Sequence, residues 1–346
     1  MDRETLGIVA FPFLFLLLAF RVPIGLAMLL VGSAGTAMIA GWLPIFSQVK
    51  TSAWHLFSNY SLSVIPLFLL MGNLASRAGM SEALFKFASA CLGHRKGGVA
   101  MAAVGACAGF GAICGSSLAT AATMGKVALP ELRRLGYSGS LSTGALAAGG
   151  TLGILIPPSV ILIIYSILTE QNIAKMFLAA LVPGILAALG YIVTIAIFVR
   201  LVPGSGRAQQ RITMAGRMSY FRNIWHVLLI FTFMLSGIYL GWFTPTEGAA
   251  VGAAGTGLVA MFQKNFDLSA LLDVIQSTAI TSGMIFLVLL GAEFFNSFIA
   301  LTQLPVLLAS FVTEGGFSPL VVVAAILVLY LLLGCLMDSM AMILLT

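Results

Sequence analysis

The chain has 346 residues, of which 60% are hydrophobic and 8% are charged, and its mean hydropathy is +1.09. Soluble domains carry roughly 25% charged residues, so this composition excludes a water-soluble fold and indicates a protein whose solvent is lipid. The net charge of +6 does not indicate nucleic acid as a partner, because the basic residues lie between apolar runs and fit orientation in a membrane. We therefore expect an all-α protein that crosses the lipid bilayer several times.

The first predicted region is an N-terminal scaffold over residues 1–60. Two apolar runs, residues 6–20 and 23–41, approach the length of about 20 residues that a membrane helix needs. Residues 47–60 contain Trp54, His55 and Tyr60, a composition that suits a segment at the outer membrane interface.

The second predicted region is a first repeat over residues 61–200. A crossing over residues 61–76 leads into a basic connector, residues 77–96. The apolar stretch that follows, residues 97–132, is interrupted by Gly109-Phe-Gly-Ala-Ile-Cys-Gly-Ser-Ser and ends at Glu131-Leu-Arg-Arg. Because basic residues flank both ends, we expect the chain to turn back at the interruption as a re-entrant helical hairpin.

A broken helix is predicted next, over residues 140–169, because Ile156-Pro-Pro-Ser interrupts an apolar run. A cytoplasmic loop is predicted over residues 201–222, since five arginines and no acidic residue lie between residues 200 and 222. Second scaffold helices over residues 223–276 and a second repeat over residues 277–346 complete the predicted order. On this path most lysines and arginines face the cytoplasm, as the positive-inside rule requires.

The second half resembles the first. Residues 65–72, IPLFLLMG, match residues 284–291, MIFLVLLG. Gly115 and Gly334 are separated by the same number of residues as these segments, and we expect Gly334 to open a second small and polar interruption, Gly-Cys-Leu-Met-Asp-Ser. The basic connector 77–96 corresponds to residues 297–317, which contain no basic residue, so the equivalent segments lie on opposite sides of the membrane. Inverted repeats of this kind place substrate and ion sites near the midplane. The second hairpin begins at about residue 318 and stops within its return limb, so we expect the natural chain to be longer.

The interruption in the first hairpin is the first candidate site. Gly111 and Gly115 permit a tight turn, and Ser116, Ser117 and Thr120 offer hydroxyl groups. Backbone carbonyls freed by such a break are suitable ligands for a hard cation such as Na⁺. The helix that follows directs its N–H groups toward any carboxylate substrate. The alternative is that these small residues serve close helix packing.

The second candidate site lies in the broken helix and comprises Thr151, Pro157, Pro158 and Ser159. Two adjacent prolines remove two backbone donors and leave upstream carbonyls free to bind an ion. The alternative is a simple kink.

The third candidate is Asp338 with Ser339 in the matching interruption of the second half. A carboxylate within the membrane costs about 2.5–3.5 kcal/mol on insertion scales, which favours a functional role. Structural pairing with a buried partner is the alternative. Glu293 with Asn296 is a similar pair nearer to the outer end of its helix.

Thr244-Pro-Thr-Glu247 predicts a helix start instead of a site. Threonine at the N-cap, proline at the first helical position and glutamate at the third form a capping box.

No enzymatic motif accompanies these candidates: the sequence contains no P-loop, H-E-x-x-H or G-x-S-x-G pattern. We therefore expect a protein that is not an enzyme, needs no cofactor and takes its energy from an ion gradient or from another subunit.

Four motifs together resemble the large membrane subunit of tripartite ATP-independent periplasmic (TRAP) transporters. In chain order they are Gly111-Ala-Ile-Cys-Gly-Ser-Ser-Leu-Ala-Thr-Ala-Ala-Thr, Gly153-Ile-Leu-Ile-Pro-Pro-Ser, Phe243-Thr-Pro-Thr-Glu-Gly-Ala-Ala-Val-Gly and Gly334-Cys-Leu-Met-Asp-Ser-Met-Ala-Met-Ile-Leu-Leu-Thr. The resemblance covers essentially the whole chain. Members of the family normally continue past the position of Thr346 into a second proline-containing break.

The resemblance implies an elevator-type importer in the bacterial inner membrane. Such proteins work with a small four-helix membrane subunit and a periplasmic substrate-binding protein, and they take up C4-dicarboxylates, sialic acid or similar organic acids with Na⁺ as the coupling ion. Carried over to this chain, the resemblance implies that Gly115–Thr120, Pro157–Ser159 and the region of Asp338 line the binding sites for substrate and sodium. The connector 77–96 and its counterpart would hold the moving domain as arms. The implied Na⁺ ligands are backbone carbonyls and hydroxyls near Gly111, Ser116, Pro157 and Gly334.

The main alternative function is a stand-alone ion-coupled carboxylate carrier that needs no binding protein. An intramembrane enzyme lacks a convincing nucleophile and base, and a passive channel fits paired broken helices less well than alternating access does.

Overall fold

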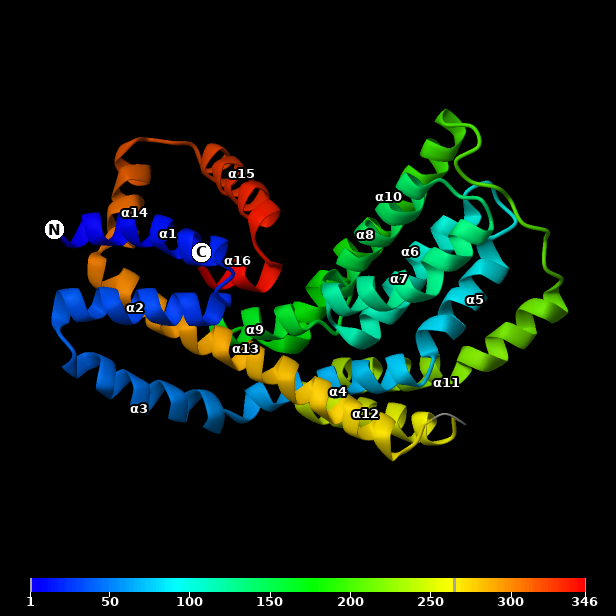
Figure 1. Cartoon of the computed structure of the whole chain (residues 1–346), viewed down its shortest axis with the longest axis horizontal. Helices are drawn as coiled ribbons and strands as arrows, with labels where there is room; N and C mark the ends of the chain where they lie inside the picture. Colours follow the sequence, from blue (N-terminus) through cyan, green and yellow to red (C-terminus); the bar gives the residue numbers. More distant parts are fainter. Residues whose placement is uncertain (1, 264–265, 346) are drawn as a thin grey trace. The chain divides into compact units, whose positions relative to one another are not determined.

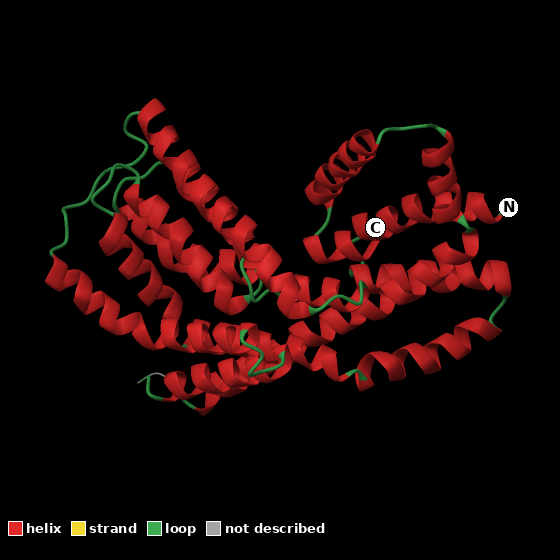
Figure 2. Ribbon diagram, turned by 180° about the vertical axis from the view of Figure 1, so that it is seen from behind, coloured by secondary structure: helices red, strands yellow, loops and turns green. Residues whose placement is uncertain are grey.

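The computed structural model describes residues 2–263 and 266–345, and within them every regular element is a helix. In chain order these are α1 (Arg3–Ala19), α2 (Ile24–Ala40), α3 (Leu43–Ser58), the 3₁₀ helix η1 (Tyr60–Ser63), α4 (Val64–Arg77), α5 (Met80–Leu92), α6 (Gly98–Cys114), α7 (Ser117–Arg134), α8 (Gly139–Leu155), α9 (Val160–Leu168), α10 (Ile173–Leu201), α11 (Met214–Tyr239), α12 (Pro245–Met261), α13 (Leu268–Thr302), α14 (Leu304–Glu314), α15 (Pro319–Leu336) and α16 (Ser339–Leu345). Figure 2 shows loops only as connections between helices. The expected all-α class is confirmed.

Several helices have the length and composition of membrane spans. Among the described residues, α10, α11 and α13 are each long and apolar enough to cross a bilayer alone. Two helix pairs separated by a short break add to them, α3 with η1 and α4, and α8 with α9 bent by 40°, which gives up to 5 spans by length and composition in the part of the chain that the structure describes. Shorter apolar helices such as α2 and α6 accompany them. The fold is that of a polytopic membrane protein.

The described chain forms two compact units. Unit 1 contains the residues up to Leu62 and those from Ile280 on, and unit 2 contains Ser63–Ala279. The helix α13 is continuous across the limit between them, because its bounds are Leu268–Thr302 (Figure 1). The limit expected at residues 276 and 277, between scaffold and second repeat, therefore falls inside one helix.

Unit 1 is built on a close approach of α2 and α13. A methyl group added to Gly25 would lie 2.7 Å from the carbonyl oxygen of Leu287, and one added to Gly32 would lie 2.6 Å from the carbonyl carbon of Phe294. Because glycine has no side chain, the two backbones pack directly, as they do in many membrane helix pairs. Phe295 fills the space beside them with its ring at 5.6 Å from that of Phe11.

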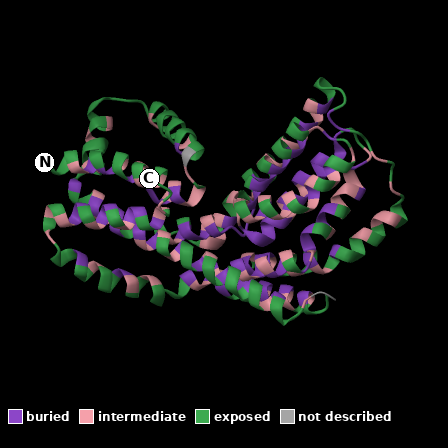
Figure 3. Ribbon diagram, in the orientation of Figure 1, coloured by how far each residue is buried: buried purple, intermediate pink, exposed green. Residues whose placement is uncertain are grey.

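Unit 2 has α6 at its core. This helix is rich in glycine and alanine and is buried along almost its whole length, packed by α4, α5, α7, α8 and α10 (Figure 3). Small side chains let five neighbouring helices approach, which explains why a helix so rich in glycine and alanine is buried along almost its whole length. The long helix α10 presents mostly exposed apolar side chains, as a helix facing lipid does.

The basic segment after α10 differs from the expected loop over residues 201–222. The loop covers residues 202–213 only, because Thr213 accepts a hydrogen bond from the backbone N–H of Gly216 and starts α11 at Met214. The loop is fixed to neighbouring turns. Tyr137 donates to the carbonyl of Arg207 at 2.7 Å, and the backbone N–H of Gln209 donates to the carbonyl of Gly93 at 2.8 Å.

The predicted capping box is confirmed. The backbone N–H of Glu247 donates to Thr244 Oγ1 at 3.3 Å, and the Glu247 carboxylate accepts from the backbone N–H of Thr244 at 2.8 Å. Proline occupies the first helical position of α12, so this motif sets a helix start.

Candidate functional site

The break between α6 and α7 is only two residues long. Gly115 ends α6 with a φ of +64°, a conformation that favours glycine, and its N–H donates to the carbonyl of Gly111 at 2.7 Å. Ser116 is extended and caps α7, with its hydroxyl accepting from the N–H of Ala119 at 3.4 Å. Ser117 is the first residue of α7 and is partly exposed. One helix therefore ends and the next begins with only two residues between them.

The break between α8 and α9 has a similar construction. Ile156 is extended at the end of α8, and a cis peptide bond joins Pro157 to Pro158. Ser159 is fully buried and caps α9, with its hydroxyl accepting from the N–H of Leu162 at 3.4 Å. One helix therefore ends here and another begins, so the chain is interrupted as the predicted broken helix requires, and the alternative of a simple kink does not describe it.

The structure brings the two breaks together. The N–H of Val160, the first residue of α9, donates to the carbonyl of Gly115 at 3.2 Å. A methyl group added to Gly115 would lie 3.0 Å from the carbonyl oxygen of Pro158. The first and second candidate sites thus form one site, which we call the break site and define as Gly111–Thr120 with Gly153–Val160.

Gly153 is the point at which three helices meet. A methyl group added to Gly153 would lie 2.6 Å from Thr120 Oγ1 and 2.8 Å from the carbonyl oxygen of Ser116, and one added to Gly111 would lie 2.5 Å from Gly153 Cα. Backbone atoms of α6, α7 and α8 therefore approach one another where the helices are interrupted.

Thr120 has a buried hydroxyl at the centre of the break site. Its residue has 0% exposure, and its Oγ1 has no oxygen or nitrogen partner among the described residues. The thiol of Cys114 is hydrogen-bonded to this hydroxyl, and a thiol is a weak partner. A buried polar atom without a good partner costs free energy, so this oxygen is available to a bound ligand.

The break site has oxygen ligands but no ionised side chain of its own: its residues are glycine, alanine, serine, threonine, cysteine, proline and apolar types. The C-terminal ends of α6 and α8 carry carbonyl oxygens, and the N-terminal ends of α7 and α9 carry N–H groups, that lack a partner within their own helix. Some of these groups are bonded locally, as the N–H of Val160 is to Gly115. The carbonyl ends favour a cation and the N–H ends favour an anion. Neutral oxygen ligands of this kind suit a monovalent cation.

Thr151 lies apart from the break site. It is exposed on α8, donates to the carbonyl of Ala148 at 2.7 Å and lies 3.2 Å from the hydroxyl of Tyr191 on α10. Thr151 and Gly153 are two residues apart on α8, and residues at this spacing point to different sides of a helix. Gly153 therefore faces the break site and Thr151 does not.

Asp338 and Ser339 belong to unit 1, at the break between α15 and α16. The carboxylate of Asp338 accepts from the N–H of Met340 at 3.3 Å, and Ser339 is the first residue of α16. Gly334 is helical and lies in the last turn of α15, so the expectation that it opens the interruption is wrong. The break itself is at Met337 and Asp338, and Asp338 corresponds to Ser116 as the residue before a new helix.

Glu293, the other carboxylate within an apolar run, has structural partners in unit 1. Its carboxylate accepts from the hydroxyl of Ser52 at 2.7 Å, and Gln48 of α3 donates to Ser297 Oγ at 2.9 Å. These contacts join α13 to α3, so the structure favours pairing as the role of this residue.

Gly153 and Cys114 make close contacts in the break site but are not among the predicted site residues. Both lie within the quoted motifs, where the sequence pattern assigns neither of them a role of its own. The spacing Gly150-x-x-Gly153 is a signal that could have identified the contact, since small residues at helical spacing indicate close helix approach.

Comparison with known proteins agrees with these motifs. A family model described as "Tripartite ATP-independent periplasmic transporter, DctM component" matches residues 11–346. The chain belongs to this family. The resemblance drawn from the four motifs is thus confirmed, and this TRAP large permease component is a multi-pass membrane protein of a transport family.

Relatives of this TRAP component have names that state their substrates. The chain is 37% identical over 319 residues to the "C4-dicarboxylate TRAP transporter large permease protein DctM" of Pseudomonas aeruginosa, covering 90% of this chain and 73% of that protein. It is 32% identical to the "Sialic acid TRAP transporter permease protein SiaT" of Haemophilus influenzae, over 82% of this chain and 46% of that protein. It is 30% identical to the "Sialic acid TRAP transporter large permease protein SiaM" of Vibrio cholerae, over 83% of this chain and 67% of that protein.

Proposed function

We propose that this chain is the permease component of a Na⁺-driven importer of an organic acid in the bacterial inner membrane. The acid is a C4-dicarboxylate, sialic acid or a similar carboxylate, as the names of the relatives suggest. A periplasmic binding protein delivers it, and a small four-helix membrane subunit accompanies the permease. The observation that carries the proposal is the meeting of two interrupted helices at the hydrogen bond between Val160 and Gly115.

Sodium binds at the carbonyl ends of α6 and α8 in this proposal. The supporting observation is Thr120, whose buried hydroxyl has no oxygen or nitrogen partner among the described residues. Na⁺ is a hard cation that prefers oxygen ligands, and backbone carbonyls with one hydroxyl match that preference. The break site itself contains no carboxylate, so its charge suits a monovalent ion better than a divalent one.

The substrate carboxylate binds at the positive ends of the helix dipoles, near the N-termini of α7 and α9. Ser116, Ser117 and Ser159 surround these helix starts, and free N–H groups with the positive end of the helix dipole favour an anion there. Asp338 would belong to the corresponding ion site of the second repeat. Coupling follows because a bound cation lowers the electrostatic cost of holding the anion nearby.

Alternating access in this proposal uses α6 and α7 as a re-entrant hairpin in a moving domain. The two helices pack against each other and are joined by two residues, which supports a hairpin that enters and leaves on one side. The basic connector that contains α5 would act as one arm of an elevator-type transporter.

The test is uptake of radiolabelled organic acids into proteoliposomes that contain the full-length permease and its small subunit. The binding protein is added outside, with or without an inward Na⁺ gradient. Uptake that requires both would support the proposal. Uptake without the binding protein would favour a stand-alone carrier, and uptake that is insensitive to the Na⁺ gradient would contradict Na⁺ coupling.

A further inference from the structure

A cavity of unit 2 lies away from the break site. It is a cleft of about 630 Å³ between α5, α7, the basic loop 202–213 and the start of α11. Cavities of this size hold small organic ligands. None of its lining residues belongs to the break site, so the proposed transport chemistry does not use it.

The cleft has one more cation than it has carboxylates. Lys86 pairs with Glu82 at 2.6 Å, and Arg134 pairs with Glu131 at 2.6 Å. Lys126 of α7 lines the same cleft and has no carboxylate within ion-pair distance among the described residues. Two cation–carboxylate pairs cancel, which leaves the cleft with a single positive charge to neutralise.

A hydroxyl group adds a hydrogen-bonding position. Ser89 on α5 lines the cleft, and its Oγ is shielded from solvent and has no hydrogen-bond partner among the described residues. Buried polar atoms normally have a partner, and rotation of this side chain toward the cleft would let its O–H donate to an anionic ligand. The Gln209 side chain lines the cleft as well.

The remaining wall is apolar and aromatic. Phe85, Val127, Pro130, Ile212 and Tyr220 line it. A ligand that fits both parts has an anionic group for Lys126 and an apolar portion for this wall. The cleft also lies at the end of unit 2 that carries the basic loop, and basic pockets between membrane helices recognise lipid head groups.

We propose that this cleft binds the phosphodiester headgroup of an anionic phospholipid. A phosphodiester carries one negative charge, which matches the single excess cation. A dicarboxylate or a phosphate monoester carries about two, and the second charge would lie beside Glu82 and Glu131 without compensation. The inference does not depend on Na⁺ coupling or on the identity of the transported acid.

The test is native mass spectrometry of the purified full-length protein in detergent with added dioleoyl-phosphatidylglycerol or dioleoyl-phosphatidylcholine. We expect retention of phosphatidylglycerol over phosphatidylcholine. The Lys126→Gln variant should bind phosphatidylglycerol about fivefold more weakly, the effect of one basic residue on an anionic lipid, whereas Lys126→Arg should retain binding. Ser89→Ala should weaken binding to a smaller extent.

Lys175→Gln is the matched control, because Lys175 is an exposed lysine of unit 2 outside the cleft. Loss of lipid in this variant equal to that in Lys126→Gln would overturn the site, as would unchanged binding in Lys126→Gln. Displacement of the lipid by equimolar sn-glycerol 1-phosphate would overturn the lipid assignment and point to a soluble phosphate. Thermal unfolding without lipid shows whether each variant is folded.

Discussion

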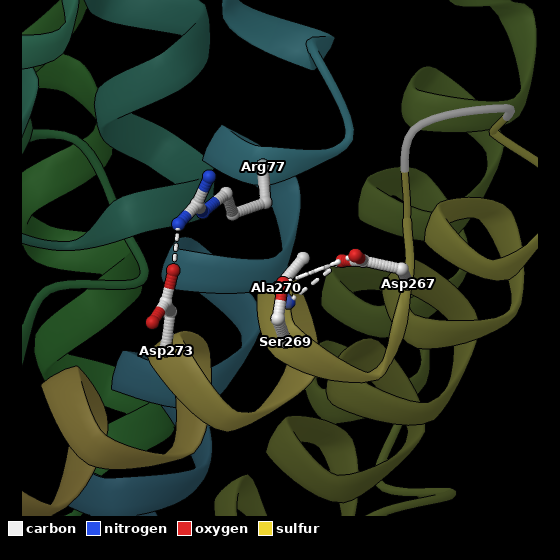
Figure 4. Close-up of polar contacts among 5 residues, drawn as sticks. All are labelled: Arg77, Asp267, Ser269, Ala270 and Asp273. Carbon is white, nitrogen blue, oxygen red and sulfur yellow. Dashed lines mark hydrogen bonds and ion pairs between the residues drawn. The ribbon is translucent and has the colours of Figure 1, made fainter.

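Arg77 at the end of α4 forms an ion pair with Asp273 of α13, and both residues belong to unit 2 (Figure 4). One turn further along the same two helices, Asn73 donates to Thr278 Oγ1 at 2.9 Å. These contacts attach the first part of α13 to α4, before the helix continues into unit 1.

The first prediction concerns this ion pair. Both side chains are more than half exposed, at 51% and 58%, so Arg77→Gln should lower the free energy of unfolding by no more than about 1 kcal/mol. The measurement is thermal unfolding in detergent at low and high salt. The reversed pair, Arg77→Asp with Asp273→Arg, should recover part of the loss. A destabilisation of several kcal/mol would mean that the pair is not exposed in the membrane protein.

The second prediction concerns pH and Asp267. This exposed residue precedes α13 and accepts from the N–H of Ala270 at 2.9 Å and from Ser269 Oγ at 3.0 Å (Figure 4). These hydrogen bonds, chiefly that from Ala270, hold the pKa of Asp267 below its ordinary value of 3.8, with a smaller effect from Arg77.

A carboxylate with a lowered pKa in the folded state stabilises the fold above its unfolded pKa, and the effect is lost as pH falls through the folded pKa. Unfolding of the wild type should therefore show an added loss of stability as the pH falls below about 4. Asp267→Asn, which keeps a capping side chain, should lack that part of the pH dependence. Parallel pH profiles of the two proteins would contradict the prediction.

The third prediction concerns Gly153. The added methyl group of Gly153→Ala would meet Thr120 Oγ1 at 2.6 Å and the backbone of Ser116 at 2.8 Å, so we expect a loss of about 1–3 kcal/mol in unfolding free energy and of most transport. The control is Gly190→Ala on α10, where nothing lies within 4 Å of the added group and alanine favours the helix. Equal stability of the two variants would show that the approach at Gly153 is looser than described.

The fourth prediction concerns Thr120. Thr120→Val removes a buried hydroxyl that has no oxygen or nitrogen partner in the described chain, so the unfolding free energy should stay the same or rise. The Na⁺ concentration for half-maximal uptake should rise about tenfold, since one oxygen ligand is lost, and Thr120→Ser should restore the wild-type value. An unchanged Na⁺ dependence in Thr120→Val would remove this residue from the ion site.

The fifth prediction concerns the start of α12. Thr244→Ala removes the cap of this helix and should lower the unfolding free energy by about 1 kcal/mol, whereas Thr244→Ser should be close to the wild type. Uptake at a temperature well below unfolding should be unchanged in both. Loss of uptake in the folded alanine variant would indicate a role beyond capping.

Much of the local structure follows from neighbouring residues. Ser116 and Ser159 cap helices because an oxygen at that position accepts from an N–H three residues on, and Pro157-Pro158 ends α8 because proline has no N–H to donate. The break between α15 and α16 follows less directly from its neighbouring residues. Gly334 looks like a helix end, yet α15 continues to Leu336, since a single glycine costs a helix only about 1 kcal/mol relative to alanine and does not stop it by itself.

The sequence by itself determined the lipid solvent, the helical class, the places of the two breaks in the first half and the family, because composition and short-range hydrogen bonding act along the chain. The tertiary structure decided which breaks meet. The pairing of Val160 with Gly115, the approach of Gly153 to Thr120 and the exposure of Thr151 on the other face of α8 depend on how α6, α7 and α8 cross. That crossing is set by the packing of small residues far apart in sequence, and no local pattern specifies which small residues touch.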